Sequence, residues 1–152
     1  MTPPLMHAEH SMSTGITSGR AAAQRARFLD DAVATASPVR LVTMLYDRLL
    51  LDLTRGADAQ SVGDRMAANT HLLHAQAIVL ELASALRPEG WSGGPALASL
   101  YAFMHSELVR ANVAGDPSRT ASVRALIEPL ADAGRAAALE VSVAVAPVDR
   151  AG

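Results

Sequence analysis

The chain contains no cysteine and no lysine, and only 3% of its residues are aromatic. The lack of cysteine excludes disulfides, thiolate metal sites and a cysteine nucleophile. All 13 cations are arginines, scattered along 152 residues whose formal net charge is −2. They form neither a stripe that could follow a phosphate backbone nor a polybasic membrane patch, so we predict no nucleic acid partner.

No hydrophobic run is long enough to span a bilayer. The longest, from Leu41 to Leu53, is interrupted by Asp47, Arg48 and Asp52, and it is shorter than the roughly 20 residues that a membrane helix needs. The first 30 residues also lack the continuous apolar core of a signal peptide. We therefore expect a cytoplasmic protein without membrane insertion.

Motifs for catalysis are missing as well. The sequence has no His-Glu-x-x-His, no phosphate-binding loop and no Gly-x-Ser-x-Gly. His71 and His74 have a spacing at which two histidines of one helix can share a metal ion, but no carboxylate on the same face completes a site. We interpret them as solvated histidines and predict no metal site, no cofactor and no enzymatic activity.

The residues that are present favour helices. Half of them are hydrophobic, and alanine and leucine, which lose little conformational freedom in a helix, dominate. We predict an all-α protein in which residues 35–140 form an antiparallel up-and-down four-helix bundle with short loops. Residues 1–34 are predicted to be a flexible N-terminal arm, partly helical near 19–33, and residues 141–152 a loose C-terminal tail. The predicted helices cover residues 38–54, 61–86, 95–113 and 117–139.

Capping and helix-breaking residues set these boundaries. Ser37 and Pro38 are a good N-cap and first residue for the first helix. Gly56 is predicted to end that helix, and Pro88 to stop the second. Pro129 lies inside the fourth predicted helix, where we expect a kink or early fraying.

The first predicted helix is apolar over more than one face. Leu41, Met44 and Leu51 fall outside its main apolar arc. Beside them lie Arg48 and Asp52, which are spaced i, i+4 and can pair across the surface. A second apolar face must be covered by something. Either another part of the same chain, such as the N-terminal arm, or a partner chain covers it, and the pattern leaves both readings open.

Two amides interrupt the apolar stripe of the second predicted helix. Asn69 and Gln76 lie seven residues apart on one face, and buried amides need hydrogen-bond partners. They can bond each other or a neighbouring helix, or they can bond the backbone of a bound peptide. The third predicted helix has a regular core stripe, which includes Tyr101 and Met104.

Three groups of residues form a pattern along the chain. The first is Thr35-Ala36-Ser37-Pro38 with Leu41-Val42 and Met44-Leu45-Tyr46-Asp47. The second is Asn69, Ala75-Gln76, Ile78 and Glu81-Leu82. The third is Leu100-Tyr101, Met104, Leu108 and Ala111-Asn112. In their order and spacing these three groups resemble the FliS family of flagellar secretion chaperones, and the resemblance covers roughly residues 28–139.

The resemblance implies a helical bundle that acts as a cytosolic export chaperone. Such a chaperone binds the disordered C-terminal segment of flagellin, prevents premature polymerisation and delivers flagellin to the flagellar type III export apparatus. A flagellar export-gate protein and a second copy of the chain are further candidate partners. Two alternatives stay open at this point: a metal-binding helical bundle, and a regulatory bundle that binds an export-gate or anti-sigma partner.

The candidate contact residues combine the resemblance with the helix faces. Phe28 and Leu29 are the residues of the arm that are expected to plug the client surface when it is empty. The residues expected to bind flagellin are Leu41, Met44, Leu45, Arg48, Leu51, Asn69, Leu73, Gln76, Leu80, Tyr101 and Met104.

Overall fold

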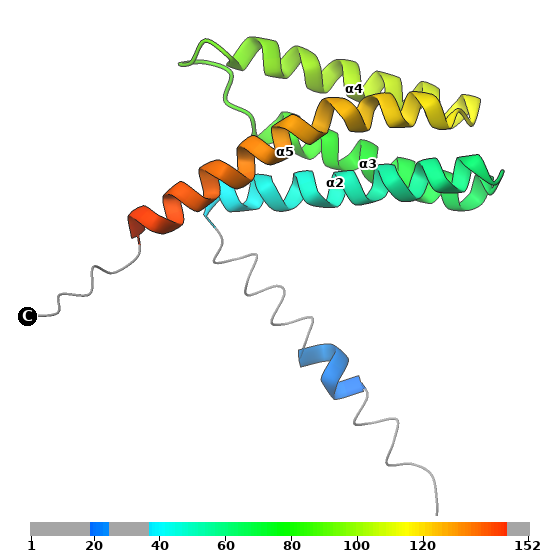
Figure 1. The fold of residues 1–152 in the computed structure, drawn as a ribbon, viewed down its shortest axis with the longest axis horizontal. Helices are drawn as coiled ribbons and strands as arrows, with labels where there is room; N and C mark the ends of the chain where they lie inside the picture. Colours follow the sequence, from blue (N-terminus) through cyan, green and yellow to red (C-terminus); the bar gives the residue numbers. More distant parts are fainter. Residues whose placement is uncertain (1–18, 25–36, 146–152) are drawn as a thin grey trace, which may run out of the picture. The chain divides into compact units, whose positions relative to one another are not determined.

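The computed structural model describes residues 19–24 and 37–145. Residues 19–24 are helical and belong to a unit of their own, which spans residues 1–36. The second unit contains four long helices, α2 (Pro38–Ser61), α3 (Arg65–Ala85), α4 (Gly94–Ala114) and α5 (Pro117–Val145) (Figure 1). No described residue lies in a strand, so the predicted all-α class is confirmed.

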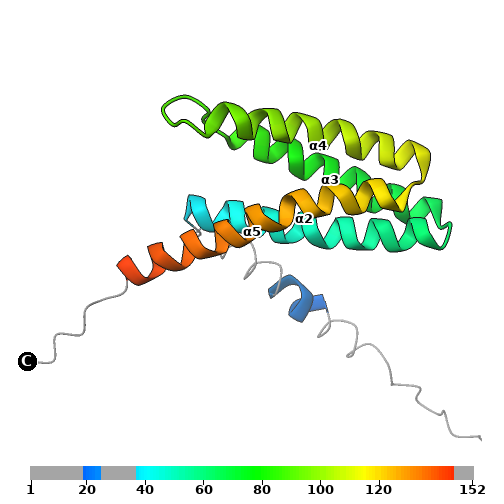
Figure 2. The same ribbon diagram turned by 45° about the horizontal axis from the view of Figure 1, so that its top comes forward.

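Each long helix packs against the next one in the chain, and α5 returns to pack against α2. Short connections therefore make successive helices antiparallel, as in an up-and-down bundle. In both ribbon views α3 runs beside α4, and α2 runs beside α5 (Figures 1 and 2). The four-helix bundle predicted from the sequence is confirmed. No helix in the described part of the chain has the length and hydropathy to cross a membrane.

Local residues explain how α2, α3 and α4 begin or end. Ser37 caps α2, where its side chain accepts a hydrogen bond from the backbone of Arg40 at 3.3 Å. Asp64 does the same for α3 by accepting from the Ala67 backbone at 3.1 Å. Gly115 ends α4 in the left-handed conformation at φ 64°, which glycine adopts without a steric cost.

Gly56 lies inside α2 and does not end it, so the predicted boundary near Thr54 is wrong: the helix continues to Ser61. A Cβ added at Gly56 would stand 3.0 Å from Cδ2 of Leu72 on α3. The glycine therefore lets α2 and α3 approach closely. Because α2 is longer than predicted, α3 begins at Arg65 and not at Ser61.

The last helix also extends beyond its predicted end. α5 is continuous through Pro129 to Val145, so residues 141–145 of the predicted tail are helical. Proline removes one helical hydrogen bond, but α5 packs against both α2 and α4. That packing holds the helix together where the local preference would interrupt it.

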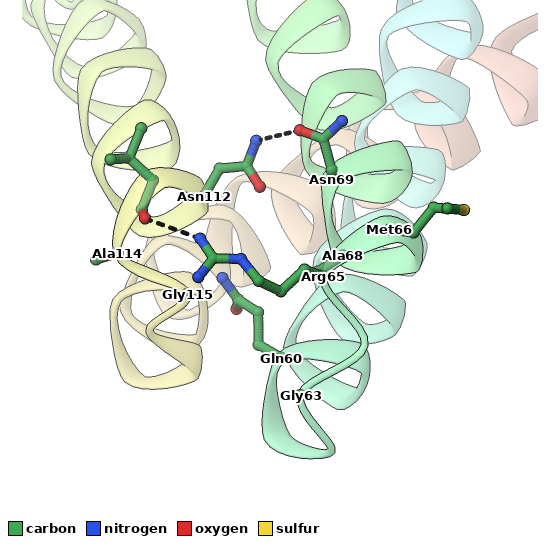
Figure 3. A pocket seen from close by; sticks show the side chains of 10 residues that line it. Gln60, Gly63, Arg65, Met66, Ala68, Asn69, Asn112, Ala114 and Gly115 are labelled. Atoms are coloured by element: carbon green, nitrogen blue, oxygen red, sulfur yellow. Dashed lines mark hydrogen bonds between the residues drawn. The ribbon is translucent and has the colours of Figure 1, made fainter.

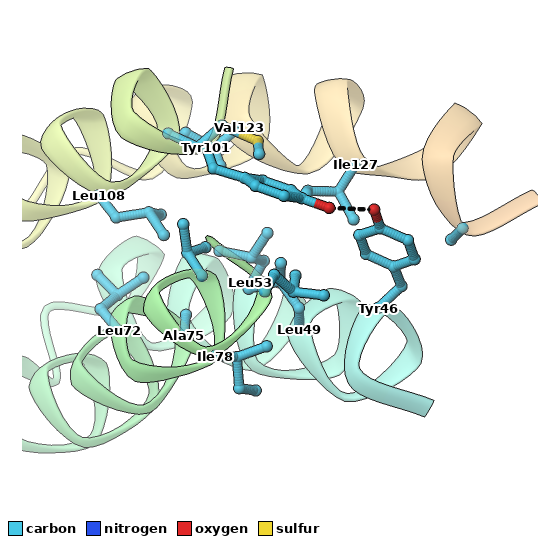
Figure 4. Packing of buried hydrophobic residues seen from close by; sticks show 14 residues of the cluster. Tyr46, Leu49, Leu53, Leu72, Ala75, Ile78, Tyr101, Leu108, Val123 and Ile127 are labelled. Atoms are coloured by element: carbon cyan, nitrogen blue, oxygen red, sulfur yellow. Dashed lines mark hydrogen bonds between the residues drawn. The ribbon is translucent and has the colours of Figure 1, made fainter. Parts of the chain in front are cut away.

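The core draws side chains from all four helices (Figure 4). Two tyrosines meet inside it, where the hydroxyl groups of Tyr46 on α2 and Tyr101 on α4 share a hydrogen bond. Burial raises the pKa of Tyr101 far above its usual value of 10.0, and the bond to Tyr46 raises it further. The largest fully buried apolar side chains are Leu49, Leu53, Leu72, Val79, Met104, Leu108, Val123 and Ile127.

A buried amide joins three helices near the α2–α3 turn. Gln60 on α2 donates from Nε2 to the carbonyl oxygen of Ala111 at 2.9 Å. Its Oε1 accepts from the hydroxyl of Thr120 on α5 at 2.7 Å. Both side chains are buried, so these bonds satisfy polar groups that would otherwise destabilise the fold.

Candidate partner-binding surface

The outer side of α2 presents apolar side chains that the bundle does not cover. Met44 and Leu51 are each 39% exposed, and they lie seven residues apart on one face. Leu41 and Leu45 are half-buried, and Arg48 is exposed. The predicted second apolar face of this helix therefore exists, and we name Leu41, Met44 and Leu51 the α2 stripe.

A second exposed row follows α3 at the same spacing of seven residues. It consists of Met66, Leu73 and Leu80, which are 83%, 51% and 54% exposed. We name these three residues the α3 stripe. Leu73 and Leu80 are among the predicted contact residues, whereas Met66 was missed, although its seven-residue spacing from Leu73 could have indicated it.

One of the two amides predicted on α3 contacts α4. Asn69 Oδ1 accepts a hydrogen bond from Nδ2 of Asn112 at 2.8 Å (Figure 3). The reading in which Asn69 bonds a neighbouring helix is thus confirmed. Gln76 is half-buried two turns further along α3. An asparagine amide nitrogen carries two N–H groups, so the bond to Asn112 leaves donors at this seam for a bound chain.

Two of the predicted contact residues do not belong to any surface. Tyr101 and Met104 on α4 are 3% and 0% exposed and are part of the hydrophobic core. The Tyr101 hydroxyl is already bonded to Tyr46. Both predictions of direct contact are therefore wrong. These side chains support the helices from within because their face of α4 points into the bundle. The arm residues Phe28 and Leu29 lie outside the described part of the chain.

His71 and His74 are partly solvated, as predicted, with side chains 27% and 49% exposed, but both also contact a carboxylate that the sequence did not place beside them. A carboxylate from the neighbouring helix, Asp52 on α2, lies between them and is completely buried. His74 Nδ1 contacts its Oδ2, and His71 Nδ1 lies 3.6 Å from Oδ1. Arg48 Nε approaches Oδ2 at 3.4 Å. The spacing of Arg48 and Asp52 predicted their contact correctly but placed the carboxylate on the surface.

The polar cluster of Arg48, Asp52, His71 and His74 connects α2 to α3 beside the α2 stripe. A buried carboxylate is costly unless nearby donors compensate its charge, and Arg48, His71 and His74 supply such donors. Within the described residues the hydrogen bonds of His74 and Arg48 both go to Oδ2, whereas the buried Oδ1 has no hydrogen-bond partner and only His71 Nδ1 nearby. Within the described residues, no group of three histidine, aspartate or glutamate side chains is arranged to hold a metal ion.

Two pockets border the stripes. A pocket of about 350 Å³ opens between the first turns of α2 and the last turns of α5, and Met44 and Leu139 form part of its wall. A larger pocket of about 760 Å³ lies between α3 and α4, where the α3 stripe ends at Met66 (Figure 3). Sequence reasoning indicated neither pocket, because their walls come from segments that are distant in the chain.

The sequence is similar to known flagellar proteins. A family model described as flagellar protein FliS matches residues 20–140. The chain is also 29% identical over 110 residues to the flagellar secretion chaperone FliS of Bacillus subtilis (strain 168). That alignment covers 72% of this chain and 82% of the relative.

Proposed function

Because the chain belongs to the FliS family of flagellar proteins, we propose that it binds the disordered C-terminal segment of flagellin in the cytoplasm. In this proposal the complex keeps flagellin from polymerising and delivers it to the flagellar type III export apparatus. The similar Bacillus subtilis protein is named a flagellar secretion chaperone. A chaperone acts by binding, so we propose no catalytic role for any residue.

The observation that carries this proposal is the apolar surface of α2 and α3. Met44, Leu51, Leu73 and Leu80 are exposed on helices whose cores are otherwise well packed. Flagellin ends bury apolar faces against one another in the filament, so a free end needs an equivalent surface. An amphipathic segment that lays its apolar face along such helices would find one.

The energetics of such a complex suit a chaperone that must release its client. A disordered segment loses conformational entropy when it folds on a surface, and this cost offsets part of the contact free energy. A large contact area then yields moderate affinity. The two stripes fit this need, because they lie on adjacent helices and expose several large apolar side chains on each.

The direct test is co-expression of the chain with flagellin from the same genome, followed by co-purification. The C-terminal flagellin peptide should also bind the purified chain in calorimetry at protein concentrations on the order of tens of micromolar. A folded bundle that shows no heat of binding and retains no flagellin would refute the proposal.

Charge substitutions test which surface the client covers. We expect Leu41→Glu and Met44→Glu to weaken flagellin binding more than they lower the free energy of unfolding, because a bound apolar segment would bury the new carboxylate. The matched control is Leu126→Glu, at a residue 38% exposed on α5, the helix that carries no predicted contact residue. If Met44→Glu unfolds the chain, Met44 belongs to the core and the α2 stripe is not a binding surface.

A further inference from the structure

The larger pocket combines a cation, three amide side chains and apolar walls at one end of the bundle. Gly63 of the α2–α3 turn and Gly115 after α4 both form part of its wall. Its volume of about 760 Å³ lies in the range of pockets that hold small ligands or short peptide ends. Figure 3 shows the Arg65 side chain crossing from α3 to α4, between the Asn69–Asn112 pair and Gln60.

Arg65 makes this pocket positive. Among the residues that the structure describes, it is the one charged residue in the wall, and it forms no salt bridge with any of them. One guanidinium nitrogen donates to the carbonyl oxygen of Val113 at 3.2 Å. A guanidinium has five N–H groups in a planar fork that matches a carboxylate, so that single bond leaves donors for an anion.

The walls beside Arg65 are apolar and exposed. Met66 and Val113 are 83% and 74% exposed, and both line the pocket. The ligand that fits this combination carries an anionic group next to an apolar side chain. Met66 is also the end of the α3 stripe, so a segment that lies along Leu80, Leu73 and Met66 would arrive at Arg65.

We propose that this pocket binds the free α-carboxylate at the C-terminal end of the client chain. Arg65 pairs with the carboxylate and Val113 contacts the last side chain of the client, while Met66, whose side chain points away from Arg65 (Figure 3), contacts the residues before it. This inference rests on the proposed function and adds a direction to it: the client runs antiparallel to α3, because the pocket lies at the N-terminal end of that helix. Capture of a chain end through its carboxylate is a known mode of peptide recognition.

The test compares two peptides of the flagellin C-terminal segment, one with a free carboxylate and one with a C-terminal amide. Calorimetry against the folded chain should give about three- to tenfold weaker binding for the amide, as expected for one partly exposed charge pair. Arg65→Gln should weaken the binding of the free-acid peptide by the same factor and leave the binding of the amide peptide unchanged. Arg65→Lys should restore part of the loss, because it keeps the charge but not the fork.

The matched control is Arg124→Gln, which removes the same charge from α5, where Arg124 Nε lies 3.4 Å from Glu128. This variant should bind the free-acid and the amide peptide with the same ratio of affinities as the unmodified chain does. Equal binding of acid and amide to the unmodified chain would overturn this inference while the proposed function survives. So would an equal loss for both peptides in Arg65→Gln, since that would assign Arg65 to a side-chain carboxylate. Failure of both peptides to bind would overturn the proposed function and this inference with it.

Discussion

Shortening the two leucines of the α3 stripe provides a quantitative test of client binding. Leu73 and Leu80 are 51% and 54% exposed, so about half of each side chain is available to a partner. We consider the double variant Leu73→Ala, Leu80→Ala. Alanine favours helices at least as well as leucine, so α3 itself should not be weakened by the change.

The exposed fractions set the size of the effect. Complete burial of a leucine side chain contributes about 1.5–3 kcal/mol. If a client covers the exposed half of both residues, the pair contributes roughly 1.5–3 kcal/mol to binding. The double variant should then bind the C-terminal flagellin peptide roughly ten- to a hundredfold more weakly. The inner halves of the same side chains contribute a similar amount to folding, which a domain with a typical stability of about 5–15 kcal/mol tolerates.

Calorimetry with the flagellin peptide measures the loss of affinity, and urea denaturation followed by circular dichroism measures the loss of unfolding free energy. Leu126→Ala on α5 is the control, because that residue is 38% exposed and should lose stability without losing affinity. A folded double variant that binds the peptide as tightly as the unmodified chain would show that the α3 stripe is not covered by the client.

Three further predictions concern the interior of the bundle. Replacing both His71 and His74 by alanine should cost about 2–3 kcal/mol of unfolding free energy at neutral pH, against about 1 kcal/mol for Asp52→Asn, because the first change leaves a buried carboxylate with Arg48 as its remaining described partner, whereas the second removes the charge. Gly56→Ala should lower stability by about 1 kcal/mol in urea denaturation despite the better helix propensity of alanine, because the new Cβ meets a buried α3 leucine at 3.0 Å. The raised pKa of Tyr101 keeps its phenol neutral in the folded state, so its stabilising contribution should be complete below pH 10.0 and lost above it as the unfolded chain ionises. Stability measured between about pH 8 and pH 11 should therefore fall more steeply in the unmodified chain than in Tyr101→Phe.

Each of these has a result that would contradict it. A larger loss of unfolding free energy in Asp52→Asn than in the double variant His71→Ala, His74→Ala would mean that the Asp52 carboxylate is well compensated without the histidines. A gain in stability in Gly56→Ala would mean that α2 and α3 can separate slightly at no cost. Parallel stability curves for the chain and Tyr101→Phe above pH 10.0 would place that phenol in contact with water.

Much of the fold could be predicted from the sequence because it depends on neighbouring residues. The alanine- and leucine-rich composition favours helices, and Ser37 with Pro38 sets the start of α2. Periodicity also separated Met44 and Leu51 from the core arc of α2, and both are exposed. Capping and periodicity act over one or two turns, so the order of residues is sufficient to predict them.

The remaining features depend on what lies across from each helix. In the sequence Gly56 is typical of a helix end, but in the structure it lies inside α2, where Leu72 of α3 packs against it. Asp52 is a surface residue by spacing, yet α3 buries it and brings His71 and His74 to its carboxylate. A helical wheel shows which residues share a face, but only the packing of a second helix decides whether that face meets water, a core or a charge. Local preferences along the chain therefore predict a helical bundle with a surplus apolar face on α2, whereas the packing of its helices sets which polar residues are buried and where the Arg65 pocket opens.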